Sequence, residues 1–129
     1  MSILVVDDDK AHLEALGDLL QLEGFSILRA SSPEDALPLF DKHLGAVALA
    51  IVDLEMPGIG GEGLIRELLA SSCPPEIIVL TGSDDHSDTV RRVGSVVREI
   101  LYKPAMPEQM MELARSIVIE WGRRTFATA

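Results

Sequence analysis

The stretch from Ala46 to Gly61 constrains the fold more than any other part of the sequence. It begins with a continuous run of apolar or small residues, Ala46–Val52, that stops abruptly at Asp53. Such a run, followed by prolines and glycines, is typical of a strand buried on both faces, although a short buried helix has the same periodicity. We interpret it as the central strand of a parallel sheet. Asp53 then lies at its carboxyl end, the edge at which open α/β sheets bind ligands.

Four further segments are predicted strands, and they alternate with predicted helices. The strands are expected at Ile3–Val6, Phe25–Ala30, Glu76–Leu80 and Arg98–Tyr102. Helical spacing of apolar residues predicts helices over about 11–22, 32–42 and 61–70, a fourth after the polar loop 83–87, and a last one that includes 110–121. Strands that alternate with helices imply a parallel sheet with right-handed crossovers on both faces. The expected fold is α/β, a doubly wound five-stranded parallel sheet with five helices.

Local signals at two helices refine this prediction. Ser32 followed by Pro33 and two acidic residues indicates a helix start, with a hydroxyl at the N-cap and proline in the first turn. Pro38, inside the same helix, removes a backbone donor and is expected to kink or weaken it. The fourth helix contains three β-branched valines and Gly94, so we expect it to be the least stable helix of the domain.

The length and composition of the chain exclude several classes of protein. With 129 residues, the chain has room for one core, so we expect a single domain over 1–129. The formal charge of −10 argues against direct, non-specific binding to nucleic acid. The single cysteine, Cys73, cannot form an internal disulfide, and no chemistry is assigned to it. The sequence has no segment apolar enough to span a bilayer and starts with a predicted strand, so we expect a cytoplasmic protein without membrane contact.

Polar residues follow the ends of the predicted strands and should share one edge of the sheet. They are Asp7, Asp8, Asp53, Thr81 and Lys103. Carboxylates placed close together repel one another unless a cation lies among them, and oxygen ligands without His or Cys favour Mg²⁺ over zinc. A lysine and a hydroxyl beside them suit a phosphoryl group. The set indicates a site at which a phosphoryl group reaches a carboxylate, which can act as the nucleophile.

Four short motifs at these strand ends carry a resemblance to a known family. They are ILVVDDD after the start, IVDLEMPG around Asp53, VLTG at Thr81 and LYKP at Lys103. In this order they make the chain resemble a response-regulator receiver domain of two-component signalling, similar to the chemotaxis regulator. The resemblance covers essentially the whole chain. It implies a flavodoxin-like sheet with strand order 2-1-3-4-5.

The resemblance also implies roles for individual residues of the acidic pocket. Asp53 is expected to be the phosphoacceptor and a ligand of Mg²⁺. Asp8 is expected to bind the metal directly, Asp7 through water, and Glu55 through its backbone carbonyl. Asp9 falls outside this set, and we expect it to have a loop or helix-capping role.

Further roles concern catalysis of the transfer and the conformational switch. Lys103 is expected to bind a phosphoryl oxygen and Thr81 to move toward another, while Pro104 holds the following turn, in a form that includes the cis peptide. Many receivers carry Tyr or Phe three residues before the lysine, where this chain has Ile100, and Tyr102 lies on the same strand face. We therefore expect phosphorylation to reshape the weak fourth helix, over 84–94, without an aromatic rotation. His12 is expected to be an exposed residue with no part in the site.

The partners implied are a sensor histidine kinase or histidine phosphotransfer protein and a downstream output protein or domain. The receiver surface formed by the fourth helix, fifth strand and last helix is expected to transmit the signal, in a monomer or a phosphorylation-dependent dimer. The chain is then no enzyme beyond its own phosphorylation and dephosphorylation. Whether it is a stand-alone relay or adaptor, or part of a larger regulator with a DNA-binding or enzymatic output, stays open.

Two other classes of function are weaker readings of the same residues. A Mg²⁺-dependent phosphatase of small phosphate esters would use Glu55 as general acid, but the sequence has no cap segment to enclose a substrate. A nucleotide or flavin binder needs a Gly-rich phosphate loop after the first strand. The sequence has Asp7, Asp8 and Asp9 there instead.

Overall fold

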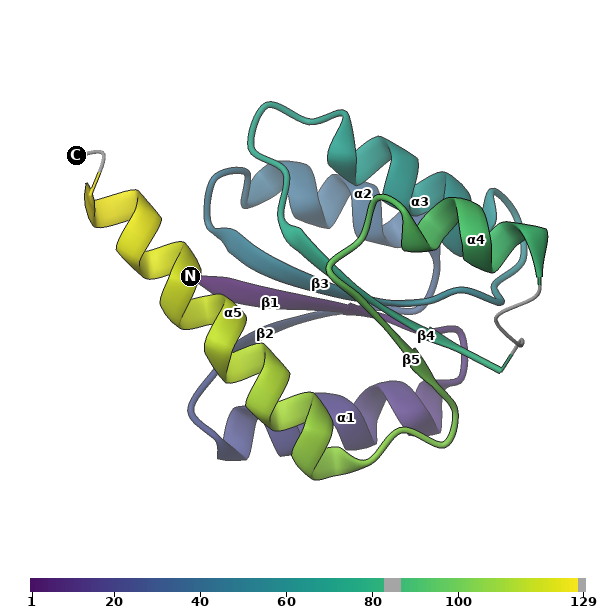
Figure 1. Cartoon of the computed structure of the whole chain (residues 1–129), viewed down its shortest axis with the longest axis horizontal. Helices are drawn as coiled ribbons and strands as arrows, with labels where there is room; N and C mark the ends of the chain where they lie inside the picture. The colour runs from purple at the N-terminus through teal and green to yellow at the C-terminus, as the bar shows by residue number, and fades with distance from the viewer. Residues whose placement is uncertain (83–86, 128–129) are drawn as a thin grey trace.

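The computed structural model describes residues 1–82 and 87–127 and shows a parallel sheet of five strands in the order β2-β1-β3-β4-β5 (Figure 1). The strands are β1 (Ser2–Val6), β2 (Ser26–Ala30), β3 (Val47–Asp53), β4 (Glu76–Thr81) and β5 (Glu99–Tyr102). The predicted fold class and strand order are therefore confirmed. Observed and predicted strand ends differ by about one residue.

Helices cover both faces of this sheet (Figure 1). On one face lie α1 (Lys10–Leu22) and α5 (Pro107–Ala127). The other face carries α2 (Pro33–Lys42), α3 (Gly60–Leu69) and α4 (Asp88–Gly94). Each layer of helices encloses its own apolar cluster against the sheet. Among the described residues, no helix is both long enough and apolar enough to cross a bilayer.

The predicted central strand is confirmed in β3, which pairs with β1 on one side and β4 on the other. All seven of its residues are buried. Ala50 and Val52 pack in the cluster under α2, α3 and α4, whereas Leu49 and Ile51 pack in the cluster under α1 and α5. This alternation explains the uninterrupted apolar sequence, because side chains of a strand point to opposite faces in turn and both faces are covered.

The helix starts follow the local sequence signals. Ser32 is the N-cap of α2, and its hydroxyl accepts a hydrogen bond from the Asp35 N–H at 3.1 Å. Asp9 caps α1 in the same way, accepting from the His12 N–H at 3.2 Å, so its predicted capping role is confirmed. Pro38 lies inside α2, which continues through it to Lys42.

Helix α4 is the shortest of the helices in residues 1–82 and 87–127, with seven residues, of which Val90 and Val93 are buried. It is held to α3 by an ion pair in which Arg92 donates from Nε to Glu62 at 2.8 Å. The guanidinium makes a second bond to the same carboxylate at 3.1 Å. Both side chains are at the surface, where such pairs contribute little to stability. The apolar anchorage of α4 therefore rests mainly on two valines.

Candidate functional site

The predicted site residues lie together at the carboxyl edge of the sheet. Backbone hydrogen bonds continue past the strand ends and fix these residues in place. The Asp7 N–H donates to Ala30 O at 3.2 Å, and the Lys103 N–H donates to Thr81 O at 2.8 Å. Because the strands are parallel and adjacent, polar residues that are far apart in the sequence meet at one edge.

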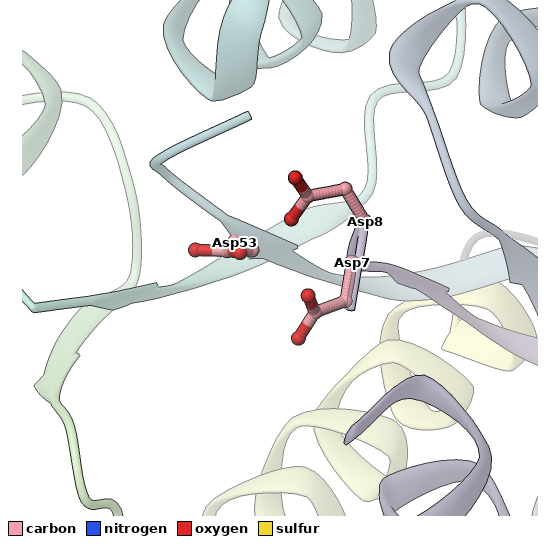
Figure 2. A group of neighbouring side chains, drawn as sticks. All are labelled: Asp7, Asp8 and Asp53. Carbon is pink, nitrogen blue, oxygen red and sulfur yellow. The ribbon is translucent and has the colours of Figure 1, made fainter. Parts of the chain in front are cut away.

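Asp7, Asp8 and Asp53 form a group in which one carboxylate oxygen from each residue lies within 4.8 Å of the other two. Figure 2 shows Asp7 and Asp8 at the end of β1 beside Asp53, with their carboxylates extending to the same side as that of Asp53. Asp7 and Asp53 are buried, while Asp8 is exposed. Three carboxylates at this spacing, open to solvent on one side, are a donor set that suits Mg²⁺, which takes oxygen ligands and keeps several waters. The residues thus fit the metal that the sequence predicted.

Asp53 combines deep burial with a direct cationic partner. Its side chain is 4% exposed, and its Oδ1 accepts a hydrogen bond from Lys103 Nζ at 2.9 Å. Burial raises the pKa of Asp53, the Lys103 hydrogen bond lowers it, and the charge of Asp7 raises it, so that the pKa lies at about 6. Without a metal, Asp53 therefore titrates close to neutral pH.

Lys103 stays cationic despite partial burial. Burial lowers the pKa of Lys103. The hydrogen bond to Asp53 and the charges of Asp53, Asp7 and Glu55 together raise it by more, so the net shift of the pKa is upward. The pKa values of both partners of this ion pair, Asp53 and Lys103, are therefore raised. The reason is that Asp53 is more deeply buried and also faces Asp7, whereas the lysine side chain is 35% exposed.

The Glu55 side chain makes a contact that the sequence did not predict. Its carboxylate accepts a hydrogen bond from the Thr81 hydroxyl at 2.8 Å and another from the Gly82 N–H at 2.6 Å. The family resemblance implied a role for Glu55 through its backbone carbonyl, and the phosphatase alternative used its side chain as general acid, but neither involved Thr81 or Gly82. The signal available in the sequence was an acidic residue two positions after Asp53, where it can face the end of β4 and reach Thr81 and Gly82.

His12 is exposed, as expected, but the expectation that it has no part in the site was wrong. Its Nδ1 contacts the Oδ2 of Asp7. The contact arises because Asp9 caps α1 and starts the helix at once, so that His12, in its first turn, faces back toward Asp7. His12 therefore belongs to the surroundings of the acidic group.

Comparison with known proteins agrees with this geometry. Residues 3–115 match the family model described as "Response regulator receiver domain". The chain belongs to the response regulator receiver domain family. Among relatives of this receiver, the transcriptional regulatory protein AruR of Pseudomonas aeruginosa is 33% identical over 119 residues, which cover 90% of the receiver and 48% of AruR. A cyclic di-GMP phosphodiesterase of Thermotoga maritima is 30% identical over 104 residues, covering 81% of the receiver and 27% of the relative.

Solved structures show the same likeness. A response regulator receiver domain from Clostridium thermocellum is 27% identical, with a TM-score of 0.81 and 98% coverage of both chains. A receiver protein from Pseudomonas putida is 32% identical, with a TM-score of 0.78, over 88% of this receiver and 94% of that chain. The receiver spans about half the length, or less, of the curated relatives it matches. Receiver domains are typically signalling domains rather than enzymes.

The residues expected to form the switch lie on β5 and just after it. Ile100 packs in the cluster under α4, where a Cβ on Gly94 would approach its Cδ1 to 3.1 Å. Tyr102 is 44% exposed. The peptide bond between Lys103 and Pro104 is cis. Of the expected fourth-helix segment, residues 84–86 lie outside the described residues.

Magnesium is expected to stabilise the receiver through its acidic group. A ligand that binds only the folded state at one hundred times its dissociation constant adds about 2.7 kcal/mol to the free energy of unfolding. Thermal unfolding with and without saturating Mg²⁺ measures this gain. Asp8→Asn should lose most of it, because the variant removes a carboxylate of the group. Asp41→Asn, on α2, is the matched control and should retain the full response. An equal Mg²⁺ response in Asp8→Asn and the wild type would contradict the assignment.

Proposed function

We propose that residues 1–129 form a single receiver domain and that Asp53 accepts a phosphoryl group from a phosphohistidine. The donor is a sensor histidine kinase or a histidine phosphotransfer protein, which places the receiver in the cytoplasm. The observation that carries this proposal is the setting of Asp53, a buried carboxylate 2.9 Å from a lysine ammonium and grouped with two further carboxylates. Family membership supports it independently.

In the proposed reaction, an Asp53 oxygen attacks the phosphorus atom of the phosphohistidine. The new P–O bond forms as the P–N bond breaks, and the imidazole nitrogen of the donor keeps the electron pair. Lys103 provides a positive charge for the phosphoryl oxygens and holds the attacking carboxylate in place. When bound, Mg²⁺ would supply the charge neutralisation of the transferred group that phosphoryl transfer requires. Asp8, Asp7, Asp53 and the Glu55 carbonyl are the groups proposed to hold it.

The response to phosphorylation is proposed to pass through Thr81 to the surface of α4, β5 and α5. The weak anchorage of α4 and the presence of Ile100 instead of an aromatic residue support a change in α4 without an aromatic rotation. The partner on this surface is proposed to be an output protein or domain, or a second receiver. Relatives that are named as transcriptional regulators and a phosphodiesterase are at least about twice as long as the receiver. A stand-alone relay or adaptor is the alternative arrangement.

Intact mass spectrometry after incubation with acetyl phosphate and Mg²⁺ tests the phosphoacceptor. We expect one added phosphoryl group in the wild type and in Asp41→Asn. No addition is expected in Asp53→Asn or when EDTA is present. Addition of a phosphoryl group to Asp53→Asn at the wild-type level would show that another residue is the acceptor. Continuous release of phosphate from a small aryl phosphate would instead favour a phosphatase.

A further inference from the structure

The Glu55 carboxylate joins the ends of two adjacent strands at the proposed phosphorylation site. Glu55 lies two residues after Asp53, and its N–H donates to Asp53 Oδ1 at 3.3 Å. Its two carboxylate oxygens accept from two consecutive donors at the end of β4, the Thr81 hydroxyl at 2.8 Å and the Gly82 N–H at 2.6 Å. Thr81 is completely buried, whereas Glu55 and Gly82 are exposed. An anion from the β3–α3 loop therefore occupies donors at the edge that holds Asp53.

We propose that Glu55 is an internal competitor of the phosphoryl group, whose carboxylate holds the Thr81 hydroxyl and the Gly82 amide until phosphorylation of Asp53 displaces it. This inference rests on the proposed function. It makes Glu55 a positioning residue, which acts through Thr81 and Gly82.

The competition follows from the chemistry of the donors. A hydroxyl carries one proton and can direct it to one acceptor at a time, and a backbone amide has a single N–H. A carboxylate is a strong acceptor for both, because hydrogen bonds to an ionised group are stronger than neutral ones. A phosphoryl group on Asp53 needs donors of the same kind. Thr81 can turn toward it only after its bond to Glu55 has broken.

Charge also favours displacement once Asp53 is phosphorylated. A phosphoryl group adds negative charge close to Glu55, which is tied to Asp53 by the short backbone segment between them. Two anions near each other in a partly buried site repel. Since Glu55 is exposed, its carboxylate can move into water at low cost. The contact is thus stable without a phosphoryl group and unfavourable with one.

Binding of beryllofluoride, a phosphoryl mimic, in the presence of Mg²⁺ tests the competition. We expect Glu55→Ala to bind about tenfold more tightly than the wild type, which corresponds to about 1.4 kcal/mol. Glu55→Asp keeps the charge but shortens the side chain by one methylene group, and it should bind severalfold more tightly. Titration followed by ¹⁹F NMR gives the dissociation constants.

Glu34→Gln is the control for loss of negative charge alone. Glu34 belongs to α2, and its carboxylate lies against Gly58, which is in the same β3–α3 loop as Glu55. A Cβ on Gly58 would lie 2.6 Å from Glu34 Oε1. The affinity of Glu34→Gln for beryllofluoride should stay within about twofold of the wild type if the contact of Glu55 with Thr81 and Gly82, rather than net charge, is decisive. Unchanged or weaker binding in Glu55→Ala, or an equal gain in Glu34→Gln, would overturn the inference. If beryllofluoride did not bind to the wild type at all, both the inference and the proposed function would be overturned.

Hydrogen exchange of the Gly82 amide tests the contact without any phosphoryl mimic. We expect this amide to exchange at least about tenfold faster in Glu55→Ala than in the wild type, because the variant removes its acceptor. Asp41→Asn, on α2 and outside the site, leaves Glu55 in place and should keep the wild-type rate. Equal rates in the wild type and Glu55→Ala would show that Glu55 does not hold Gly82, and the competitor role would fall.

Discussion

Asp53→Asn is expected to make the metal-free receiver more stable at pH 7.5, by about 2 to 3 kcal/mol, although it removes the proposed phosphoacceptor. The pKa of Asp53 is about 6 in the folded protein, against an ordinary value of 3.8, and burial is the largest cause of the rise. Ionised Asp53 is therefore less favourable in the folded chain than in the unfolded one. Asparagine has nearly the same shape and carries no charge, so it avoids this penalty.

The sign of the effect determines its pH dependence. Between pH 3.8 and about 6, the folded wild-type chain binds more protons than the unfolded chain, so its stability falls as the pH rises. The loss of folding stability caused by ionisation of Asp53 is complete once the pH is well above the pKa of Asp53 in the folded protein. Asp53→Asn lacks this contribution, so the difference between variant and wild type should be small near pH 4 and constant above about pH 7.

Urea unfolding in EDTA at a series of pH values measures this difference. Asp41→Asn serves as the control, and its difference from the wild type should not change with pH in the same window. Saturating Mg²⁺ should narrow the gap between wild type and Asp53→Asn, because the metal stabilises the ionised form. If Asp53→Asn were less stable than the wild type at pH 7.5, the ion pair with Lys103 would outweigh the burial of Asp53.

Gly61→Ala is expected to destabilise the receiver by about 2 kcal/mol and to disturb Asp53. A Cβ at Gly61 would lie 2.6 Å from the Asp53 backbone oxygen and 2.6 Å from the Leu54 Cα. Backbone atoms cannot turn aside as a side chain does, so the loop after β3 has to shift. Overpacking of this kind costs about 1 to 3 kcal/mol, partly offset by the better helix propensity of alanine.

Gly122→Ala is the matched control for Gly61→Ala, because Gly122 also lies within a helix, α5. Within the described part of the chain, a Cβ there would approach only the flexible Met1 side chain, at 3.7 Å, and it should stabilise the receiver by up to about 1 kcal/mol. Urea unfolding compares the two variants, and chemical shifts of Asp53 and Leu54 show whether the strand end moves. Wild-type stability in Gly61→Ala would mean that the loop yields without cost.

Much of the fold follows from local patterns in the sequence. The apolar run before Asp53 identified β3 because it is covered on both faces, and Ser32 identified the start of α2 because its hydroxyl satisfies a free N–H. The acidic group could be placed because parallel strands bring their carboxyl ends to one edge. These inferences need only the period of the pattern and the direction of the strands.

Contacts that depend on side-chain conformation across elements could not be predicted in this way. Glu55 reaches Thr81 across 26 positions of sequence, and its exposed, acidic character is equally typical of a residue without a partner. The orientation of the His12 side chain toward Asp7 depends on the exact residue at which α1 starts. The close approach of Gly61 to β3 likewise depends on the path of the loop, about which a glycine in the sequence says little.

The two-sided packing of β3 divides the receiver into a stiff part and a compliant part. To displace β3 along its axis, both apolar clusters would have to be disrupted, since alternate residues are embedded in each. Helix α4 has one packed face and two buried valines, so it can move at far lower cost. Asp53 is therefore held on a rigid support, and a rearrangement that starts at this end of β3 is accommodated more easily by α4 than by the sheet.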